Sequence, residues 1–142
     1  MSGIKVHMAV DTNGLPHAIG VTTANVSDRD GAVVMFTSNK TNLTNVKKVL
    51  CDGGYTGEAF SNAVKSILGD DVCIEIAKRS EMHTFVVIPK RWVVERTFAW
   101  LEKCRRLWKN CERKLHTTLQ MVSLSLLALI LRRYQTGSKT AW

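Results

Sequence analysis

Hydrophobic and polar residues alternate in two short runs at the start of the chain. The runs Ile4–Val10 and His17–Thr23 are typical of β-strands, and the turn residues Asp11-Thr12-Asn13-Gly14 lie between them. An Asn-Gly pair between two such runs is the strongest short signal for a hairpin, because both residues tolerate the backbone angles of a tight turn. The pattern therefore predicts an antiparallel hairpin, with Asp11 capping the turn through its own side chain.

The next segment predicts a helix, followed by a strand, a helix and a second strand. Residues 28–38 fit a short helix with Asp28 as its N-cap. Val46–Cys51 and Val72–Ala77 are apolar runs typical of buried strands, and a helical pattern between them runs from about residue 56 to residue 68. A strand, helix, strand unit favours parallel pairing with a right-handed crossover.

The last third of the chain is helical in its periodicity. From residue 91 to about residue 108, apolar residues recur along one face of a helix and Glu95 falls on the opposite face. Residues 117–134 are apolar over most of the circumference, which predicts a helix buried against the sheet or against a partner chain. No repeat or linker interrupts the pattern, so we expect one α/β domain over residues 1–142, with a basic and apolar helical segment at 91–135.

Charge is concentrated in the same part of the chain. The net charge is +8 at pH 7, and residues 88–135 hold eleven of the twenty Lys and Arg residues but only three of the twelve acidic residues. A one-sided basic segment favours polyanionic partners such as nucleic acid, because each phosphate contact releases condensed counterions. A solvated helix face has the same composition, so charge alone does not decide between the two interpretations.

The cysteines indicate a reducing compartment. Cys51, Cys73, Cys104 and Cys111 form no CxxC pair, and no His lies beside them at zinc-ligand spacing, so we expect reduced and mostly buried thiols. The N-terminus lacks the pattern of a signal peptide, and the longest uninterrupted apolar run, Leu126–Leu131, is too short to cross a bilayer. These features predict a cytoplasmic protein without a membrane segment.

Two carboxylates are candidates for chemistry. Asp52 ends a predicted strand and precedes two glycines, a location that binding residues favour, and hard cations such as Mg²⁺ bind oxygen ligands of this kind. Glu95 lies on the charged face of a predicted helix. Each also has a purely structural interpretation, since Asp52 could be an ordinary turn residue and Glu95 could pair with Arg91 one helical turn away.

Two segments decide between these interpretations when they are considered together. Leu50-Cys51-Asp52-Gly53-Gly54-Tyr55 and the run from Ile88 to Leu101, IPKRWVVERTFAWL, strongly resemble the two later catalytic blocks of bacterial insertion-sequence DDE transposases. The segments His7–Thr12 and Ala24–Asp30 are also similar to that family. The resemblance spans nearly the whole chain, and it implies an RNase H-like mixed sheet flanked by helices.

The resemblance implies a metal-dependent reaction on DNA. Asp52 would be the second acid of the DDE triad and Glu95 the third, and both would bind a pair of Mg²⁺ or Mn²⁺ ions that promotes strand cleavage and transfer during transposition. DNA phosphates would be held by the basic residues near Glu95, namely Arg91, Arg96, Lys103, Arg105 and Arg106.

The chain departs from the family pattern in three places. Ile88 stands where many relatives have tyrosine, and Glu102 stands where many have lysine, with Lys103 beside it. In such enzymes the first aspartate lies on the strand before the hairpin, whereas this chain begins at the hairpin. The resemblance therefore implies a partial catalytic domain whose first strand is missing, and little Mg²⁺-dependent cleavage by this chain alone.

Two non-catalytic interpretations stay open beside the enzyme. The chain could be an inactive transposase remnant that binds DNA, or an oligomerisation module built on the apolar helix at 117–134. The expected partners are therefore DNA and, in the second case, further copies of the same chain.

Overall fold

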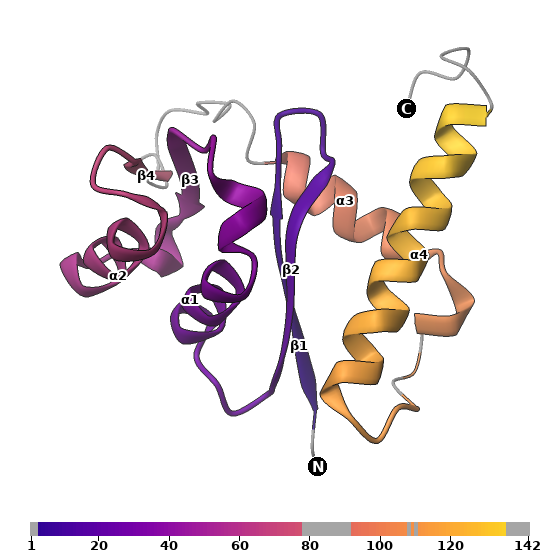
Figure 1. Cartoon of the computed structure of the whole chain (residues 1–142). Helices are drawn as coiled ribbons and strands as arrows, with labels where there is room; N and C mark the ends of the chain where they lie inside the picture. The colour runs from indigo at the N-terminus through magenta and orange to yellow at the C-terminus, as the bar shows by residue number, and fades with distance from the viewer. Residues whose placement is uncertain (1–2, 78–91, 108, 110, 136–142) are drawn as a thin grey trace, which may run out of the picture.

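The computed structural model describes residues 3–77, 92–107, 109 and 111–135. Four strands and four α-helices follow one another within these residues, which confirms the expected α/β class (Figure 1). In chain order they are β1 (Ile4–Val10), β2 (Pro16–Thr23), α1 (Asp28–Ser38), β3 (Lys48–Asp52), α2 (Glu58–Leu68), β4 (Cys73–Ala77), α3 (Trp92–Glu102) and α4 (Leu115–Gln135). Short 3-10 helices lie at Lys40–Leu43, Gly53–Tyr55 and Arg105–Leu107.

Strands β1 and β2 form the predicted antiparallel hairpin. Asp11 caps its turn, because the Oδ1 atom accepts hydrogen bonds from the backbone N–H groups of Asn13 (2.8 Å) and Leu15 (3.0 Å). Gly14 completes the turn with a φ of 84°, a conformation that side chains with a Cβ rarely adopt. The turn role predicted for Asp11 is therefore confirmed.

Strands β3 and β4 pair in parallel, with Asp52 opposite Ala77 at the carboxyl end of the ladder. Helix α2 connects them and is bounded by Gly57 and Gly69, which both have positive φ angles. The strand, helix, strand unit is confirmed. Among the described strands, however, β1–β2 and β3–β4 are two separate two-stranded sheets, so these residues by themselves do not form one mixed sheet.

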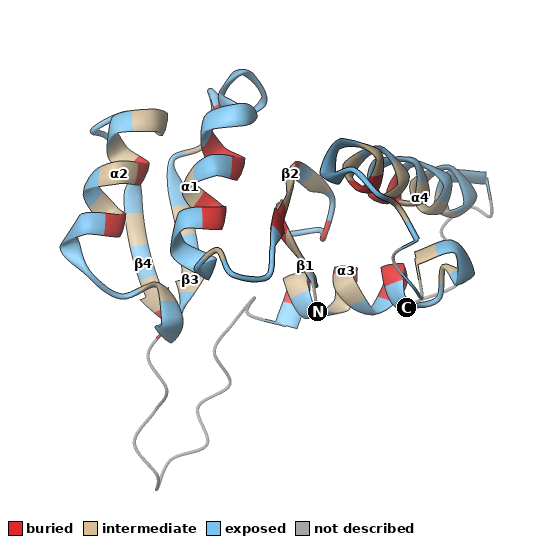
Figure 2. Ribbon diagram, turned by 90° about the horizontal axis from the view of Figure 1, so that it is seen from below, coloured by how far each residue is buried: buried red, intermediate tan, exposed pale blue. Residues whose placement is uncertain are grey.

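The β1–β2 hairpin has helices on both of its faces. Helix α1 packs on one face, and α3 and α4 pack on the other (Figures 1 and 2). Successive side chains of a strand point to opposite faces, so the hairpin contributes to two cores. Ala9 and Ala18 belong to the core on the α1 side, whereas Val6, Met8 and Ile19 pack against the core formed with α3 and α4.

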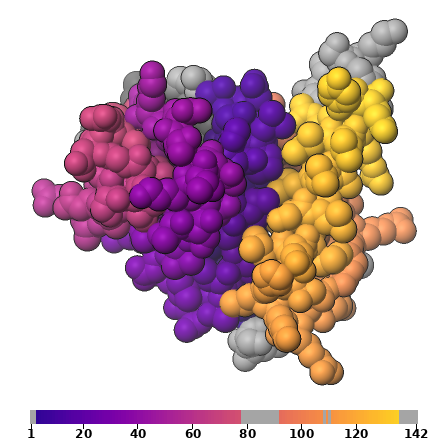
Figure 3. All heavy atoms as spheres, viewed as in Figure 1, coloured from indigo at the N-terminus to yellow at the C-terminus, as the bar shows by residue number. Residues whose placement is uncertain are grey.

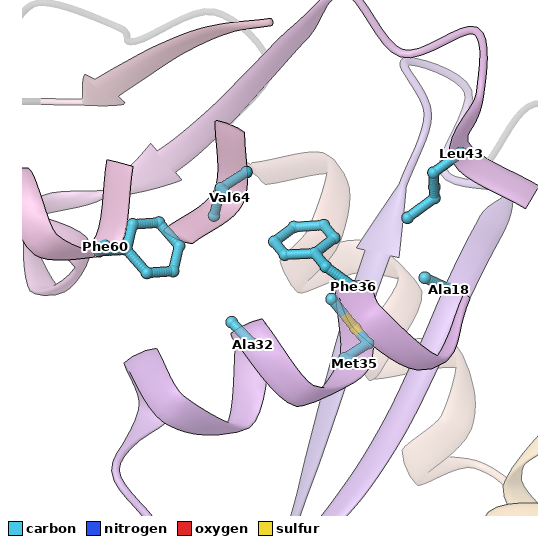
Figure 4. Close-up of a cluster of buried hydrophobic side chains, with 7 residues drawn as sticks. All are labelled: Ala18, Ala32, Met35, Phe36, Leu43, Phe60 and Val64. Atoms are coloured by element: carbon cyan, nitrogen blue, oxygen red, sulfur yellow. The ribbon is translucent and has the colours of Figure 1, made fainter. Parts of the chain in front are cut away.

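The larger core joins the hairpin to α1 and α2. Phe36 of α1 lies between Phe60 and Val64 of α2 on one side and Ala18 of β2 on the other (Figure 4). Burying a phenylalanine side chain contributes about 1.5–3 kcal/mol to stability, so Phe36 and Phe60 are major contributors to the packing of α1 on α2. This core holds β3, and with it Asp52, on the α1 side of the molecule.

The N-cap of α1 differs from the prediction. Ser27 caps the helix, since its Oγ accepts a hydrogen bond from the backbone N–H of Asp30 (3.1 Å). Asp28 is instead the first helical residue, and its carboxylate forms an ion pair with Lys5 of β1 (3.0 Å). The predicted cap was one residue late because a serine directly before an acidic residue offers two adjacent capping groups, and the ion pair draws Asp28 toward β1.

Helix α3 ends at Glu102 and is shorter than predicted. The chain then tightens into the 3-10 helix Arg105–Leu107. On one continuous α-helix Leu101 and Leu107 would point about 120° apart. The tighter turn allows both leucines to pack against the same cluster on α4, which explains why the helix does not continue.

Helix α4 is only partly buried within this single chain, and its predicted alternative, burial against a partner chain, stays a prediction. Its buried residues are Thr118, Val122 and Leu126, a single narrow stripe, and α4 packs on β2 and α3. By length and composition α4 could also cross a membrane, contrary to the expectation from the uninterrupted apolar run. One such helix is weak evidence for a membrane span.

The cysteines are free thiols, as predicted, but they are not mostly buried. Cys73 and Cys111 are exposed, and Cys51 and Cys104 are half-buried. Cys73 begins the edge strand β4, where alternate side chains face solvent, and this explains its exposure.

His7 of β1 packs directly on a glycine of α1. The ring is buried, and its Nε2 lies 2.8 Å from the hydroxyl oxygen of Thr22. A Cβ atom at Gly31 would lie only 2.2 Å from the same ring nitrogen, so the ring occupies the space that any other residue would need. Burial lowers the pKa of His7 below its ordinary value, which favours the neutral ring.

Helix α3 is joined to the hairpin turn by two hydrogen bonds. The fully buried Thr97 shares its hydroxyl hydrogen between the carbonyl oxygens of Gly14 (2.9 Å) and Val93 (3.1 Å). The Arg96 Nη2 atom donates to the carbonyl oxygen of Asn13 (3.0 Å). We call this set, Asn13, Gly14, Arg96 and Thr97, the turn–helix contact. It joins residues 83 positions apart in the sequence, and it sets where the first turns of α3 lie.

We predict that Gly31→Ala lowers the free energy of unfolding by about 1–3 kcal/mol, because the new methyl group overlaps the His7 ring. The direction of this change is diagnostic, because replacing glycine with alanine inside a helix normally raises the free energy of unfolding by about 0.5–1 kcal/mol. Denaturant titration of Gly31→Ala, His7→Ala and the double variant should show strong non-additivity. Val34→Ala, an exposed change in the same helix, is the control. A Gly31→Ala protein more stable than the parent would contradict the packing described.

The second prediction concerns the turn–helix contact. Thr97→Val should lower the free energy of unfolding by about 1–3 kcal/mol, because the buried carbonyl of Gly14 loses its hydrogen-bond donor. Thr37→Val is the matched control: its hydroxyl bonds only the Val33 carbonyl of its own helix, and the residue is exposed. Equal and small effects of both substitutions, measured by denaturant titration, would show that the Thr97 bond contributes little.

Candidate active site

Asp52 lies where the sequence placed it, at the carboxyl end of a strand. Its Oδ1 atom accepts a hydrogen bond from the backbone N–H of Gly54 (2.8 Å) and thereby starts the 3-10 helix Gly53–Tyr55. The side chain is exposed. The turn thus fixes one carboxylate oxygen and leaves the group open to solvent, an arrangement compatible both with a turn residue and with a metal ligand.

The turn that follows Asp52 is attached to α1. Arg29 donates its Nε hydrogen to the carbonyl oxygen of Gly54 (2.9 Å). Burial raises the pKa of Tyr55, and the negative charges of Asp28 and Asp52 raise it further. Asp28 and Arg29 therefore belong to the surroundings of Asp52, a relationship that the sequence analysis missed because nothing in the sequence places the start of α1 beside the end of β3.

Cys51, the residue before Asp52 in β3, is half-buried. Burial, with a smaller contribution from the charge of Asp52, raises the pKa of Cys51 to about 11. A thiol with such a pKa is almost entirely protonated at neutral pH and is a poor nucleophile. Cys51 is therefore a packing residue, and the carboxylate of Asp52 is the chemically available group at this strand end.

Glu95 lies in the first turn of α3 and is exposed. The opposite face of the helix carries the buried residues Val93, Thr97, Trp100 and Leu101, so the predicted separation of faces is correct for this part of the helix. An acidic side chain in a first turn is favoured by the helix dipole. Arg91, the alternative partner of Glu95 from the sequence, lies outside the described residues.

The two candidate carboxylates are held by different parts of the fold. Asp52 ends β3, whose turn packs against α1, whereas Glu95 is on α3, which packs against β1 and α4. Within the described residues, no group of three His, Cys, Asp or Glu side chains is arranged to bind a metal ion. The approach of the Asp52 and Glu95 carboxylates to one another stays a prediction.

The predicted DNA-binding cations fall into distinct environments. Lys103 and Arg105 are exposed after the end of α3. Arg106 is also exposed, but it forms an ion pair with Glu112, which offsets part of its charge. Arg96 is half-buried in the turn–helix contact and stacks on two tryptophan rings. Arg91 lies outside the described residues.

Comparison with known proteins places the chain in a family. The model of the transposase DDE domain family matches residues 1–131. The proposed transposase of insertion sequence element IS402 from Burkholderia cepacia is 34% identical over an alignment of 119 positions that covers 79% of this chain. The match covers 55% of that relative, so the chain spans about half the length of the curated relative. No solved structure matches this chain. The resemblance drawn from the sequence is confirmed, and the chain belongs to the transposase DDE domain family.

Proposed function

We propose that this chain carries two of the three carboxylates with which a DDE transposase cleaves and joins DNA strands. Asp52 is the second acid and Glu95 the third. The observation that carries the proposal is the position of Asp52: an exposed carboxylate at the carboxyl end of β3, on a turn fixed by its own side chain and by Arg29. Family membership supplies the type of reaction.

The residues present are suited to hard divalent cations. Both candidate side chains offer exposed carboxylate oxygens, which Mg²⁺ and Mn²⁺ bind together with water and substrate phosphate. Asp52 and Glu95 would therefore hold the ions. When bound, two such ions activate a water or a 3′-hydroxyl for attack on phosphorus and stabilise the leaving oxygen.

The proposal includes an RNase H-like core completed from outside these 142 residues. Among the described strands, β1 pairs only with β2 and β3 only with β4, so each pair has an open edge that could accept a further strand. The relative from Burkholderia cepacia is also longer than the matched region. We propose that the first aspartate is supplied by such a strand.

DNA would be held by the cations around α3. Lys103 and Arg105 are exposed and suited to phosphate contacts, and we propose the same role for Arg91, Arg96 and Arg106. Contacts of this kind position the duplex without reading its sequence. Because the substrate is DNA, we assign the protein to the bacterial cytoplasm.

A second candidate function is self-association through α4, which lies open along one flank of the molecule (Figure 3). Leu124, Leu127, Leu131 and Tyr134 are at least half exposed, and they repeat at intervals of three, four and three residues, the spacing of a coiled-coil seam. Helix α4 contains no acidic residue and carries Arg132 and Arg133 in its last turn. Parallel pairing would bring these arginines together, so we propose an antiparallel pair of α4 helices.

We predict that Asp52→Asn and Glu95→Gln each abolish Mg²⁺-dependent nicking of a supercoiled plasmid by the full-length protein that contains this chain, because each removes a metal ligand. The matched controls are Asp71→Asn, in an exposed loop, and Glu58→Gln, an exposed glutamate in the first turn of α2. Both controls should nick like the parent protein. The 142-residue chain alone should show little nicking. Persistent nicking by Asp52→Asn would overturn the assignment.

The self-association candidate predicts a dimer whose population rises with protein concentration. Leu127→Lys should convert it to a monomer, because the charge would be buried in the seam. Ala128→Lys, an exposed change about 100° around the same helix from Leu127 and outside the seam, should leave the mass unchanged. Light scattering coupled to size exclusion measures the mass. A parent chain that is monomeric at every concentration would rule out this candidate.

A further inference from the structure

Two tryptophans and two arginines form an alternating stack on the α3 side of the molecule. The Arg96 guanidinium lies 4.5 Å from the ring centroid of Trp92 and 5.1 Å from that of Trp100. Arg133 of α4 lies 4.3 Å from the Trp100 centroid. All three distances are within the range of a cation–π interaction. We call these four residues the tryptophan–arginine stack.

The stack is fixed at its centre and open at one end. Arg96 is held by its hydrogen bond to the Asn13 carbonyl, and Trp100 is only 8% exposed. Trp92, at the start of α3, is 51% exposed. Its indole therefore has Arg96 against one face, while much of the remaining ring surface faces solvent.

The stack also concentrates positive charge. Arg96 and Arg133 contact the same indole, and burial together with the charge of Arg96 lowers the pKa of Arg133. An anion beside these guanidinium groups would relieve their mutual repulsion. The exposed indole and the cations thus offer the two elements that single-stranded nucleic acid uses, a ring for base stacking and charge for the backbone.

We propose that Trp92 is a stacking platform for an unpaired DNA base, with Arg96 and Arg133 attracting the neighbouring phosphates. The proposal rests on the proposed function, in which DNA is the substrate. It adds that this surface of the protein prefers unpaired bases to paired ones. Bases inside a duplex have both faces covered by their neighbours, so an indole face on the protein surface can stack only on an exposed base.

The test compares binding of the 142-residue chain to a labelled mixed-sequence single strand and to the same sequence as a blunt duplex. Trp92→Ala should weaken single-strand binding at least about fivefold and change duplex binding little. Trp92→Phe, which keeps an aromatic face, should retain most of the affinity. Val34→Ala is the control, a change at a similarly exposed apolar residue of α1, away from the stack and from the α4 seam. A strand carrying 2-aminopurine should lose fluorescence on binding the parent chain but not Trp92→Ala.

Three results with Trp92→Ala would overturn the proposal: equal weakening for both DNA forms, unchanged single-strand binding, or a loss of folding stability that accounts for its weaker binding. The catalytic proposal fails separately, through nicking by Asp52→Asn. If Trp92→Ala weakens single-strand binding as predicted but Asp52→Asn still nicks DNA, the role of Trp92 is retained and the assignment of Asp52 is rejected. Absence of binding to either DNA would contradict the platform.

Discussion

The hydrogen bonds of the turn–helix contact determine how the two halves of this chain are joined. Local sequence forms the hairpin and local sequence forms α3, whereas the bonds from Thr97 to Gly14 and from Arg96 to Asn13 join the start of α3 to the turn. The turn can accept them because Gly14 brings its backbone close to the helix, where a Cβ would lie 3.0 Å from the Thr97 hydroxyl. Glu95 and Trp92 take their positions from this contact.

Local features of the fold were predictable because they depend on neighbouring residues. The Asn-Gly signal gave the β1–β2 hairpin, and the helix of residues 28–38 was predicted with its observed bounds. Features that depend on residues far apart in the sequence were not predictable. The end of α3 depends on Leu107 reaching a cluster on α4, and the exposure of Leu124, Leu127 and Leu131 depends on how little of α4 the hairpin covers.

In the candidate site, too, the features set by neighbouring residues were predictable and those set by distant residues were not. The position of Asp52 at a strand end and the outward face of Glu95 follow from strand length and helical period. The ion pair between Arg106 and Glu112 could not be predicted, because neither helical nor strand periodicity places these two residues side by side. Since this pair offsets the charge of Arg106, Lys103 and Arg105 are the more available cations. The tryptophan–arginine stack was also missed, because one of its members, Arg133, comes from a different helix.

The central claim is that Asp52 and Glu95 share one metal centre, although they are held by different elements. Fe²⁺ can replace Mg²⁺ at oxygen-rich sites, and with peroxide and ascorbate it generates radicals that cut the nearest backbone. In the full-length protein bound to DNA, mass spectrometry should find cuts beside both Asp52 and Glu95, and excess Mg²⁺ should suppress both together. Cuts beside only one of the two residues, or cuts that Mg²⁺ does not suppress, would contradict a shared centre.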